Sequence, residues 1–345
     1  MKNLNILLLV FASLNLKAAI VNVSNLPDGA FPYSDVNIAM AAANAGDTIY
    51  VHGSTTAYPD FTITKSIVIL GAGGLPQTEF GLTSKFNRIT FSNNISNVEL
   101  NGLEILQYHI DFNSLTNIHN VLIQNCYFSQ GSYSNIRFTY LTNSSDIRIF
   151  NNVMVGGNNQ KIEFYANTNC FNFIIDHNII NGGITDMSIL NIVVQNNIFY
   201  NPSNGNAFNG SNSLAILSNN IFYNADPKTN LTSSIINNNM SYSSAGLLPL
   251  LGGSNFDNTN PLFVNAPNTG NYLFTHNFNL QAGSPAIAAG SDGLDLGYYG
   301  GVEAVTPLGE PLNMPKIRLM NIQNPSVPQN GNVNVKVRST KSRTN

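Results

Sequence analysis

The sequence predicts an all-β protein whose body, residues 46–306, is a single right-handed parallel β-helix. Three observations lead to this prediction. A short phrase recurs along the chain, it returns at a nearly regular interval, and the composition is polar without being charged. Charged residues make up 10% of the chain, against about 25% in an average soluble protein, and Asn, Ser, Thr and Gly fill the difference.

The recurring phrase is an alternating apolar strand, then a pair that is usually Asn-Asn, then one or two more apolar residues. It occurs as VLIQNCYF (121–128), IRIFNNVM (147–154), FIIDHNII (173–180), IVVQNNIF (192–199), AILSNNIF (215–222) and SIINNNMS (234–241), with a weaker copy, VELNGLEI (98–105). The anchor position of the phrase falls at Gly102, Asn125, Asn151, His177, Asn196, Asn219 and Asn238. The steps of 23, 26, 26, 19, 23 and 19 residues between anchors fit one coil of a β-helix.

Stacking explains the phrase in physical terms. The strands of one coil cannot bury their apolar faces alone, so successive coils stack about 4.8 Å apart and share one core. Asn suits the anchor because it tolerates the left-handed backbone of a sharp corner, and its amide can bond to the Asn one coil above or below. The sequence therefore predicts a structural ladder of Asn125, Asn151, Asn196, Asn219 and Asn238. A leucine-rich repeat would need a Leu consensus that this chain lacks, and a β-sandwich would not repeat a phrase in register.

Residues 1–19 have the features of a signal peptide. Lys2 precedes an apolar stretch from Leu4 to Leu16, and the small residues Ala18 and Ala19 offer a cleavage site. The stretch is shorter than the ~20 residues that span a bilayer, and no later segment is long and apolar enough to do so. We therefore expect an exported protein, secreted or associated with the cell surface, without a transmembrane segment.

Residues 20–45 are expected to close the N-terminal end of the solenoid. Residues 34–45 predict a capping helix with Ser34 or Asp35 as N-cap and Gly46 as terminator. Its apolar stripe would consist of Val36, Ile38, Met40, Ala41 and Ala42. Strands at 48–51, 61–64 and 66–70 follow, and residues 71–74 turn the chain into the coils. Residues 307–345 contain five prolines and an alternating stretch at 332–338, which predicts an extended tail with one or two strands.

Charge and cysteine content limit the classes of partner and bond. A formal net charge of -3 gives no basic footprint, so nucleic acid is excluded as a partner. Cys126 and Cys170 fall in different coils, at least ~9 Å of stacking apart, which exceeds the ~7 Å limit for Cα atoms joined by a disulfide. They are predicted to stay separate, at least partly buried thiols.

Three stretches of the chain resemble the pectate-lyase-like right-handed β-helix proteins, in particular a large secreted group from Bacteroidetes-like bacteria. They are AGDTIYV (45–51) followed by FTITKSIVILGAGG (61–74), the Asn-Asn coils, and NLQAGSPAIAAGSDGLDLGYYGG (279–301), which is similar to the closing coil of such proteins. The resemblance implies a pectin-lyase-like solenoid. It implies no single activity, because this fold carries lyases, hydrolases, epimerases, adhesins and proteins without known chemistry.

A candidate site emerges from a second alignment of coils, RITF (88–91), HIDF (109–112), NIRF (135–138) and KIEF (161–164). The Ile and Phe of each string face inward, and by the two-residue period of a strand the alternate residues face outward. The outward columns are Arg88, His109, Asn135 and Lys161, and beside them Thr90, Asp111, Arg137 and Glu163. Six ionisable groups thus gather on one sheet of a chain that is poor in charge.

This face has a structural and a functional interpretation. It is either a surface ion-pair ladder, worth about 0–1 kcal/mol per pair, or a saccharide groove. In the groove, Lys161 or His109 would be the catalytic base, and Arg137 would neutralise a uronate carboxylate. The predicted substrate-binding residues are Arg88, Asp111, Glu163, Tyr108, Tyr140 and Tyr165, the tyrosines as stacking faces for sugars.

Two motifs of glycan-cleaving enzymes with this fold are either missing from the sequence or only superficially matched. The Gly-His-Gly and Arg/Lys strings of polygalacturonase-like hydrolases are missing from the sequence, which argues against that activity. Asp176 and His177 resemble the Asp-His element of pectate lyases, but neighbouring coils hold Phe150 and Asn151 at the same positions. We therefore interpret His177 as a substitute for Asn in the ladder.

No cofactor and no metal site is predicted. Calcium needs several converging carboxylates, whereas Arg137 separates Asp111 from Glu163, and calcium near Asp292 and Asp295 is left open. The sequence favours an exported protein that associates with a polysaccharide or cell-surface glycan, with an acidic glycan on the charged face. The alternatives are a non-catalytic surface or adhesion scaffold and a polysaccharide lyase acting by β-elimination. The oligomeric state is open.

Overall fold

The structure is a computed structural model. It describes residues 18–26, 31–73, 82–129, 131, 133–156, 160–187, 189–200, 205–210, 212–213, 215–227, 231–242, 253–268, 270–303, 305, 315–322 and 335–341. Most of the predicted signal peptide, residues 1–17, lies outside the described residues, and so do most residues of the predicted tail.

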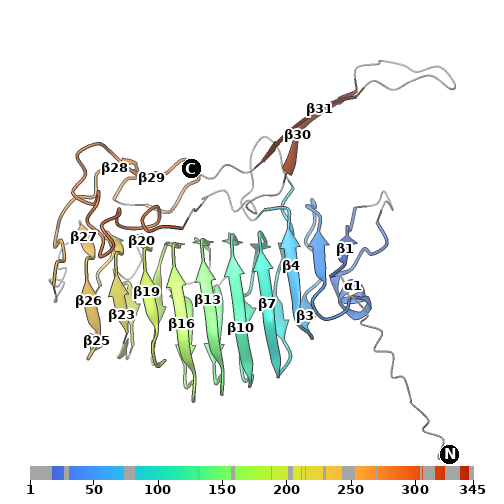
Figure 1. The fold of residues 1–345 in the computed structure, drawn as a ribbon, viewed down its shortest axis with the longest axis horizontal. Coiled ribbons are helices and arrows are strands. Elements are labelled where there is room, and N and C mark those ends of the chain that lie inside the picture. The colour runs from blue at the N-terminus through green and yellow to red at the C-terminus, as the bar shows by residue number, and fades with distance from the viewer. Residues whose placement is uncertain are drawn as a thin grey trace, which may run out of the picture.

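The body is the right-handed parallel β-helix that the sequence predicts, with three sheets that run along the stack (Figure 1). Sheet A contains β1 (Ile20–Val23), β2 (Thr48–Val51), β4 (Ile67–Gly71), β7 (Ile95–Asn101), β10 (Ile118–Gln124), β13 (Ser145–Phe150), β16 (Phe171–Asp176), β19 (Val193–Gln195), β23 (Ile216–Ser218) and β26 (Ile235–Asn237). Sheet B contains β5 (Lys85–Phe86), β8 (Glu104–Ile105), β11 (Tyr127–Phe128), β14 (Val153–Met154), β17 (Ile179–Ile180), β20 (Ile198–Tyr200), β24 (Ile221–Tyr223) and β27 (Met240–Tyr242). Sheet C contains β3 (Phe61–Ile63), β6 (Ile89–Phe91), β9 (Ile110–Asp111), β12 (Ile136–Thr139), β15 (Gln160–Tyr165), β18 (Gly183–Thr185) and β21 (Phe208–Asn209).

Each coil visits the three sheets in the same order. From β7 to β21 the chain passes through sheets A, B and C in turn, and each strand pairs in parallel with its counterparts in the adjacent coils. Two short strands, β22 (Asn212–Ser213) and β25 (Leu231–Thr232), form a separate parallel pair. The expected strands at 48–51, 61–64 and 66–70 correspond to β2, β3 and β4.

The anchor residues form the corner between sheets A and B. All seven have left-handed backbone, with φ between 52° and 70°. Asn takes this conformation more readily than other non-glycine residues, and Gly102 takes it without steric cost. His177 has φ 53°, in the place that Asn holds in the neighbouring coils.

Most hydrogen bonds between Asn side chains of adjacent coils are made by the residue that follows each anchor. The Oδ1 atoms of Asn178, Asn197, Asn220 and Asn239 each accept hydrogen bonds from the main chain and the amide of the Asn one coil earlier. Among the anchors, Asn125 donates to Asn101 and Asn151 donates to Asn125, whereas Asn219 and Asn238 bond to the C-terminal segment. The structural role predicted for the anchor column stays a prediction.

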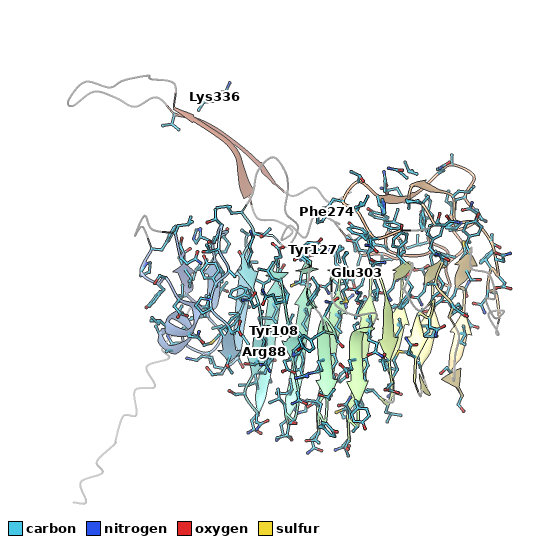
Figure 2. The ribbon with its side chains drawn as sticks, turned by 180° about the vertical axis from the view of Figure 1, so that it is seen from behind. Arg88, Tyr108, Tyr127, Phe274, Glu303 and Lys336 are labelled. Atoms are coloured by element: carbon cyan, nitrogen blue, oxygen red, sulfur yellow. The ribbon has the colours of Figure 1, made fainter. Side chains whose placement is uncertain are left out.

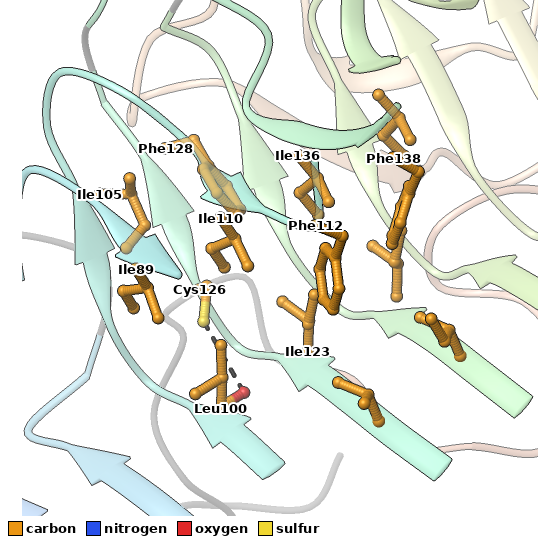
Figure 3. Close-up of a cluster of buried hydrophobic side chains, with 14 of the residues drawn as sticks. Ile89, Leu100, Ile105, Ile110, Phe112, Ile123, Cys126, Phe128, Ile136 and Phe138 are labelled. Atoms are coloured by element: carbon orange, nitrogen blue, oxygen red, sulfur yellow. Dashed lines mark hydrogen bonds between the residues drawn. The ribbon is translucent and has the colours of Figure 1, made fainter. Parts of the chain in front are cut away.

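The solenoid interior is a continuous apolar core. The predicted Ile and Phe columns lie inside it, with Ile110, Ile136 and Ile162 in register and Phe91, Phe112, Phe138 and Phe164 stacked at ring-centroid distances of 4.4, 4.7 and 5.1 Å. Figure 3 shows part of these columns, with Ile89, Ile110 and Ile136 of one and Phe112 and Phe138 of the other, together with the Cys126 thiol beside the Leu100 carbonyl. Cys126 and Cys170 are free and buried, as predicted, and burial raises the pKa of the Cys126 thiol to about 12.

The predicted helix is present as α1 (Val36–Ala42), with Asp35 as N-cap. It packs against β1, β2 and β3 at the blue end of the stack (Figure 1). Val36, Ala39 and Met40 are buried, while Ile38, Ala41 and Ala42 are exposed, so the expected stripe was wrong at those three positions. The helix ends at Ala42, with Ala43 as C-cap, instead of continuing to Ala45 before Gly46.

The described residues between 261 and 305, here called the C-terminal strap, do not form a closing coil. They include an antiparallel pair, β28 (Phe263–Asn265) and β29 (Asn277–Leu280), and return along the outside of the solenoid. Successive contacts lead from Ala289 at Asn238, through Gly297 at Asn219, to Gly300 at His177. The strap follows this path because it forms a second apolar core with the solenoid. It buries Phe263, Tyr272, Phe278, Ala286, Leu296 and Tyr298 against the outer face of sheet B.

The tail contains the strands that the alternating pattern predicts. β30 (Pro315–Ile322) and β31 (Val335–Lys341) pair as an antiparallel hairpin. Both views show this hairpin projecting away from the solenoid (Figures 1 and 2).

Candidate functional site

The outer face of sheet C carries the charged column that the sequence predicts. Thr90, Asp111, Arg137 and Glu163 lie side by side on β6, β9, β12 and β15. Adjacent members of this column are separated by one inter-strand spacing, about 4.8 Å. Asp111, Arg137 and Glu163 are therefore brought together as expected.

Asp111 is the centre of a network of ion pairs. Arg137 donates two hydrogen bonds to its carboxylate, from Nε at 3.0 Å and from a terminal nitrogen at 2.9 Å. Arg88 donates a third at 2.5 Å, and Nε2 of His109 lies 3.4 Å away. Burial alone would raise the pKa of Asp111, but the hydrogen bonds from His109, Arg137 and Arg88 outweigh burial and hold that pKa well below its ordinary value. Glu163 has a different partner, the Ser134 hydroxyl, at 2.8 Å.

The other predicted column does not face solvent. His109, Asn135 and Lys161 are buried, and only Arg88 of that column is exposed. These residues sit at the entry to their strands, where the chain turns from sheet B into sheet C. Main-chain carbonyls there need donors, and Lys161 and Asn135 both bond to the carbonyl of Gly156.

Lys161 bonds to main-chain carbonyls and is buried, so the prediction that it faces solvent was wrong. Its ammonium donates to the carbonyls of Val155 at 3.0 Å and Gly156 at 2.8 Å, and the residue is 3% exposed. Burial lowers the pKa of Lys161 to about 8. A substrate on the outer face would not reach this amine, because the residue is buried.

Two pairs of exposed tyrosines border the charged column. Tyr108 and Tyr133 stack at the entry ends of β9 and β12, with ring centroids 5.7 Å apart. Tyr140 and Tyr165 meet edge to face at the exit ends of β12 and β15, at 5.5 Å. All four are between 40% and 53% exposed. Figure 2 shows Tyr108 beside Arg88.

Sequence alignment missed Tyr133, although it named the other three. Tyr108 lies one residue before its aligned string and Tyr133 lies two before, so the two do not share an alignment column. The offset arises in the loop before β12. Gly131 has φ 120°, and a Cβ there would lie 2.4 Å from the carbonyl oxygen of Gln107, so glycine lets this loop pass close to the previous coil.

A second charged cluster, on sheet A, holds the end of the C-terminal strap. Arg148 pairs with buried Asp176 at 2.5 Å and with Glu303 of the strap at 2.6 Å. The Nε2 atom of His177 lies 2.9 Å from the carbonyl oxygen of Gly300. Arg148 and His177 thus tie the strap to the solenoid, and Asp176 holds Arg148 in place. The role of Arg148 could not be predicted from a sequence pattern, because its partner Glu303 is 155 residues away.

Among the described residues, no group of three His, Cys, Asp or Glu side chains is arranged to hold a metal ion. Asp292 and Asp295 accept main-chain hydrogen bonds from Leu294 and Ala288, which accounts for this acidic turn locally. No helix within the described parts of the chain is long and apolar enough to cross a membrane.

The comparisons with known proteins concern the fold. No family model and no curated protein matches the sequence. Among solved structures, the chain is similar to the pectate lyase Pel9A, with 17% identity and a TM-score of 0.39, over 81% of this chain and 96% of that one. It is also similar to ORF18 of Geobacillus virus E2, with 12% identity and a TM-score of 0.36, over 69% of this chain and 60% of that one. Similarity at this level carries no argument about activity.

Proposed function

We propose that the outer face of sheet C binds an extended polysaccharide and performs no chemistry on it. The observation that carries this proposal is the pair of tyrosine clusters, Tyr108 with Tyr133 and Tyr140 with Tyr165, at opposite ends of one polar face. An exposed tyrosine offers an apolar ring and a polar hydroxyl, which suits a sugar ring with one apolar face and several hydroxyls. Four such residues on neighbouring strands form a platform, whereas a single one would carry little weight.

The dimensions of the face suit a chain of sugars. Tyr140 follows Tyr133 by seven positions on the same coil, so their Cα atoms are at most about 23 Å apart along an extended strand. Each pair also spans two adjacent coils. An oligosaccharide would therefore contact both pairs when it lies roughly parallel to the strands.

The side chains between the tyrosines supply hydrogen bonds and a preference for acidic sugars. A guanidinium has five N–H donors, and the ion pairs with Asp111 use only part of those of Arg88 and Arg137. The remaining donors suit a uronate carboxylate. Arg88 is the more exposed of the two arginines. We therefore place a carboxylate-bearing sugar near Arg88.

Burial argues against catalysis at this face. The candidate bases, Lys161 and His109, are both covered, and Lys161 already bonds to two carbonyls. The mutual ion pairs at Asp111 also fit the second candidate function, a surface scaffold without a glycan ligand, because they satisfy the charges internally. Export, which the features of residues 1–19 predict, is compatible with either function.

The test is a binding screen of the purified protein against soluble uronate-containing and neutral polysaccharides, with ultraviolet absorbance followed for unsaturated products. We expect binding to a uronate polymer without product. Tyr133→Ala and Tyr165→Ala should each weaken binding about tenfold, the equivalent of one stacking contact of about 1–1.5 kcal/mol.

The matched control is Phe274→Ala, because Phe274 is a similarly exposed aromatic residue on the C-terminal strap. Figure 2 shows it apart from Tyr108 and Arg88. Equal loss in Phe274→Ala, or no binding to any polysaccharide, would leave the scaffold function. Product formation that is lost in Lys161→Ala and Arg137→Ala would establish a lyase and refute the non-catalytic proposal.

A further inference from the structure

The outer face of sheet A carries an exposed apolar surface over its last four strands, here called the sheet A patch. It consists of Phe171, Ile174, Leu190, Val193, Ile216 and Ile235. Ile174, Val193, Ile216 and Ile235 form one row across β16, β19, β23 and β26, about 14 Å wide. Leu190 and Ile235 are each 54% exposed. An apolar row of this length on a polar protein indicates an interaction surface.

The β30–β31 hairpin has an apolar face of its own. Cross-strand partners in an antiparallel pair share a face, as do alternate residues of one strand. In the sequence of β31, Val335 and Val337 alternate with Lys336 and Arg338, so the valines and the basic residues belong to opposite faces of the strand. Val335 is 46% exposed. A two-stranded hairpin is marginally stable in water, so this hairpin needs a surface that covers its apolar side.

Charge is divided between the hairpin and the body. Residues 315–341 contain five Lys and Arg and no acidic residue, whereas residues 20–306 contain seventeen acidic and seven basic residues. Next to the sheet A patch, Asp146 at the start of β13 is exposed and contacts Asn172 of β16, and Arg148 is already paired with Asp176 and Glu303. The basic hairpin and the acidic body are thus complementary in charge.

We propose that the hairpin of one chain docks on the sheet A patch of a second copy of this chain. The hairpin projects away from its own solenoid, with Lys336 near its far end (Figure 2), which places it to reach a neighbour. When both copies exchange hairpins, the two equal contacts are related by a twofold axis and the assembly closes as a dimer. Each contact covers both apolar surfaces and sets the basic hairpin against an acidic body.

The experiment measures the self-association of the full chain by sedimentation as a function of concentration. The hairpin variant is Val335→Glu with Val337→Glu, and the patch variant is Leu190→Lys with Ile235→Lys, which also repels the basic hairpin. We expect a monomer–dimer equilibrium in the unaltered protein and at least about tenfold weaker association in each variant. Val302→Glu is the matched control, because Val302 is 88% exposed and belongs to neither surface. Thermal unfolding confirms that each variant is folded.

Mixing the two variants provides the second measurement. The patch variant retains an intact hairpin and the hairpin variant retains an intact patch, so the mixture should form a heterodimer that neither variant forms alone. Association should also weaken with added salt. The proposal is overturned if the unaltered protein stays monomeric at all concentrations, if both variants dimerise like it, or if the mixture does not associate. Loss of binding to anionic phospholipid vesicles in the hairpin variant, without any dimer, would assign the hairpin to a membrane instead.

Discussion

The outer faces of sheets B and C belong to the same coils, but one is apolar and covered and the other is polar and open. On sheet B, the outward column begins with Lys85 and Glu104 and from β11 onward is apolar, with Tyr127, Val153, Ile179, Ile198, Ile221 and Met240. On sheet C, the outward column reads Thr90, Asp111, Arg137, Glu163, Thr185 and Asn209. The apolar column is covered by the C-terminal strap and becomes a second core. Among the described residues, the polar column is not covered by the strap and is bordered by the two tyrosine pairs.

This difference shows how one outer face of a solenoid can stabilise the fold while another stays available for function. The inner core needs only that every second residue is apolar, which leaves the alternate positions free. Where they are apolar, each large side chain that the strap covers stabilises the fold by about 1.5–3 kcal/mol. Where they are polar, they cost little and stay available to a ligand. Substitutions on the two faces should therefore differ sharply in their effect on stability.

The largest effect is expected in the second core. Phe278 of β29 is buried, and its ring packs against Tyr200, Phe263 and Tyr272 at 5.4, 5.1 and 6.2 Å. Phe278→Ala should lower the free energy of unfolding by about 3–5 kcal/mol, because it removes buried area and leaves a cavity. Urea unfolding followed by tyrosine fluorescence measures the loss.

Tyr165→Ala on sheet C is the matched comparison for this prediction. Tyr165 is about half exposed, so its removal should change the free energy of unfolding by no more than about 0.5 kcal/mol. Equal losses in the two variants would contradict the division between a stabilising face and a binding face.

An intermediate effect is expected at Asp111, the buried group of the open face. Asp111→Asn keeps the shape of the side chain but removes the charge that Arg88 and Arg137 share. Both arginines are partly exposed and regain water, so the expected cost is about 1–2 kcal/mol, well below that of an uncompensated buried charge. A cost as large as that of Phe278→Ala would show that sheet C also carries a major share of the stability.

The pH dependence gives an independent check on Asp111. Its pKa is lowered in the folded protein, so the unfolded chain binds a proton more readily and acid favours unfolding. The stability from this group is complete above the pKa of an unfolded aspartate, about 3.9. It is lost as the pH falls through the lower folded pKa. Between about pH 5 and pH 2, the unaltered protein should lose more stability than Asp111→Asn, and parallel curves would contradict the network.

The strands, their order and the inner core could be predicted from the sequence because they repeat. A coil phrase that recurs six times fixes register by itself, and the left-handed corners follow from the Asn at each anchor. The strap could not be predicted in the same way. Its contacts join residues that are far apart in the sequence, such as Tyr298 and Asn151. These pairs do not recur at a regular interval along the chain.

The candidate site was predictable only in part for a related reason. The two-residue period places Asp111, Arg137 and Glu163 on one face, and the structure agrees. The same period gave the wrong surroundings for His109 and Lys161, because they stand at the turn where the strand pattern begins. At a turn, the unpaired carbonyls decide where a donor points, and Lys161 turns to those of Val155 and Gly156.

The smallest effect is expected where the strap ends, at the ion pair between Glu303 and Arg148. Glu303 is exposed enough for solvent to screen the pair, so Glu303→Gln should change the free energy of unfolding by about 0–1 kcal/mol, and less at high salt. Arg148 keeps its two hydrogen bonds to Asp176 in this variant. Unfolding in urea at low and high salt measures the effect. A loss close to that of Phe278→Ala would mean that the strap is held by its end instead of by the apolar column of sheet B.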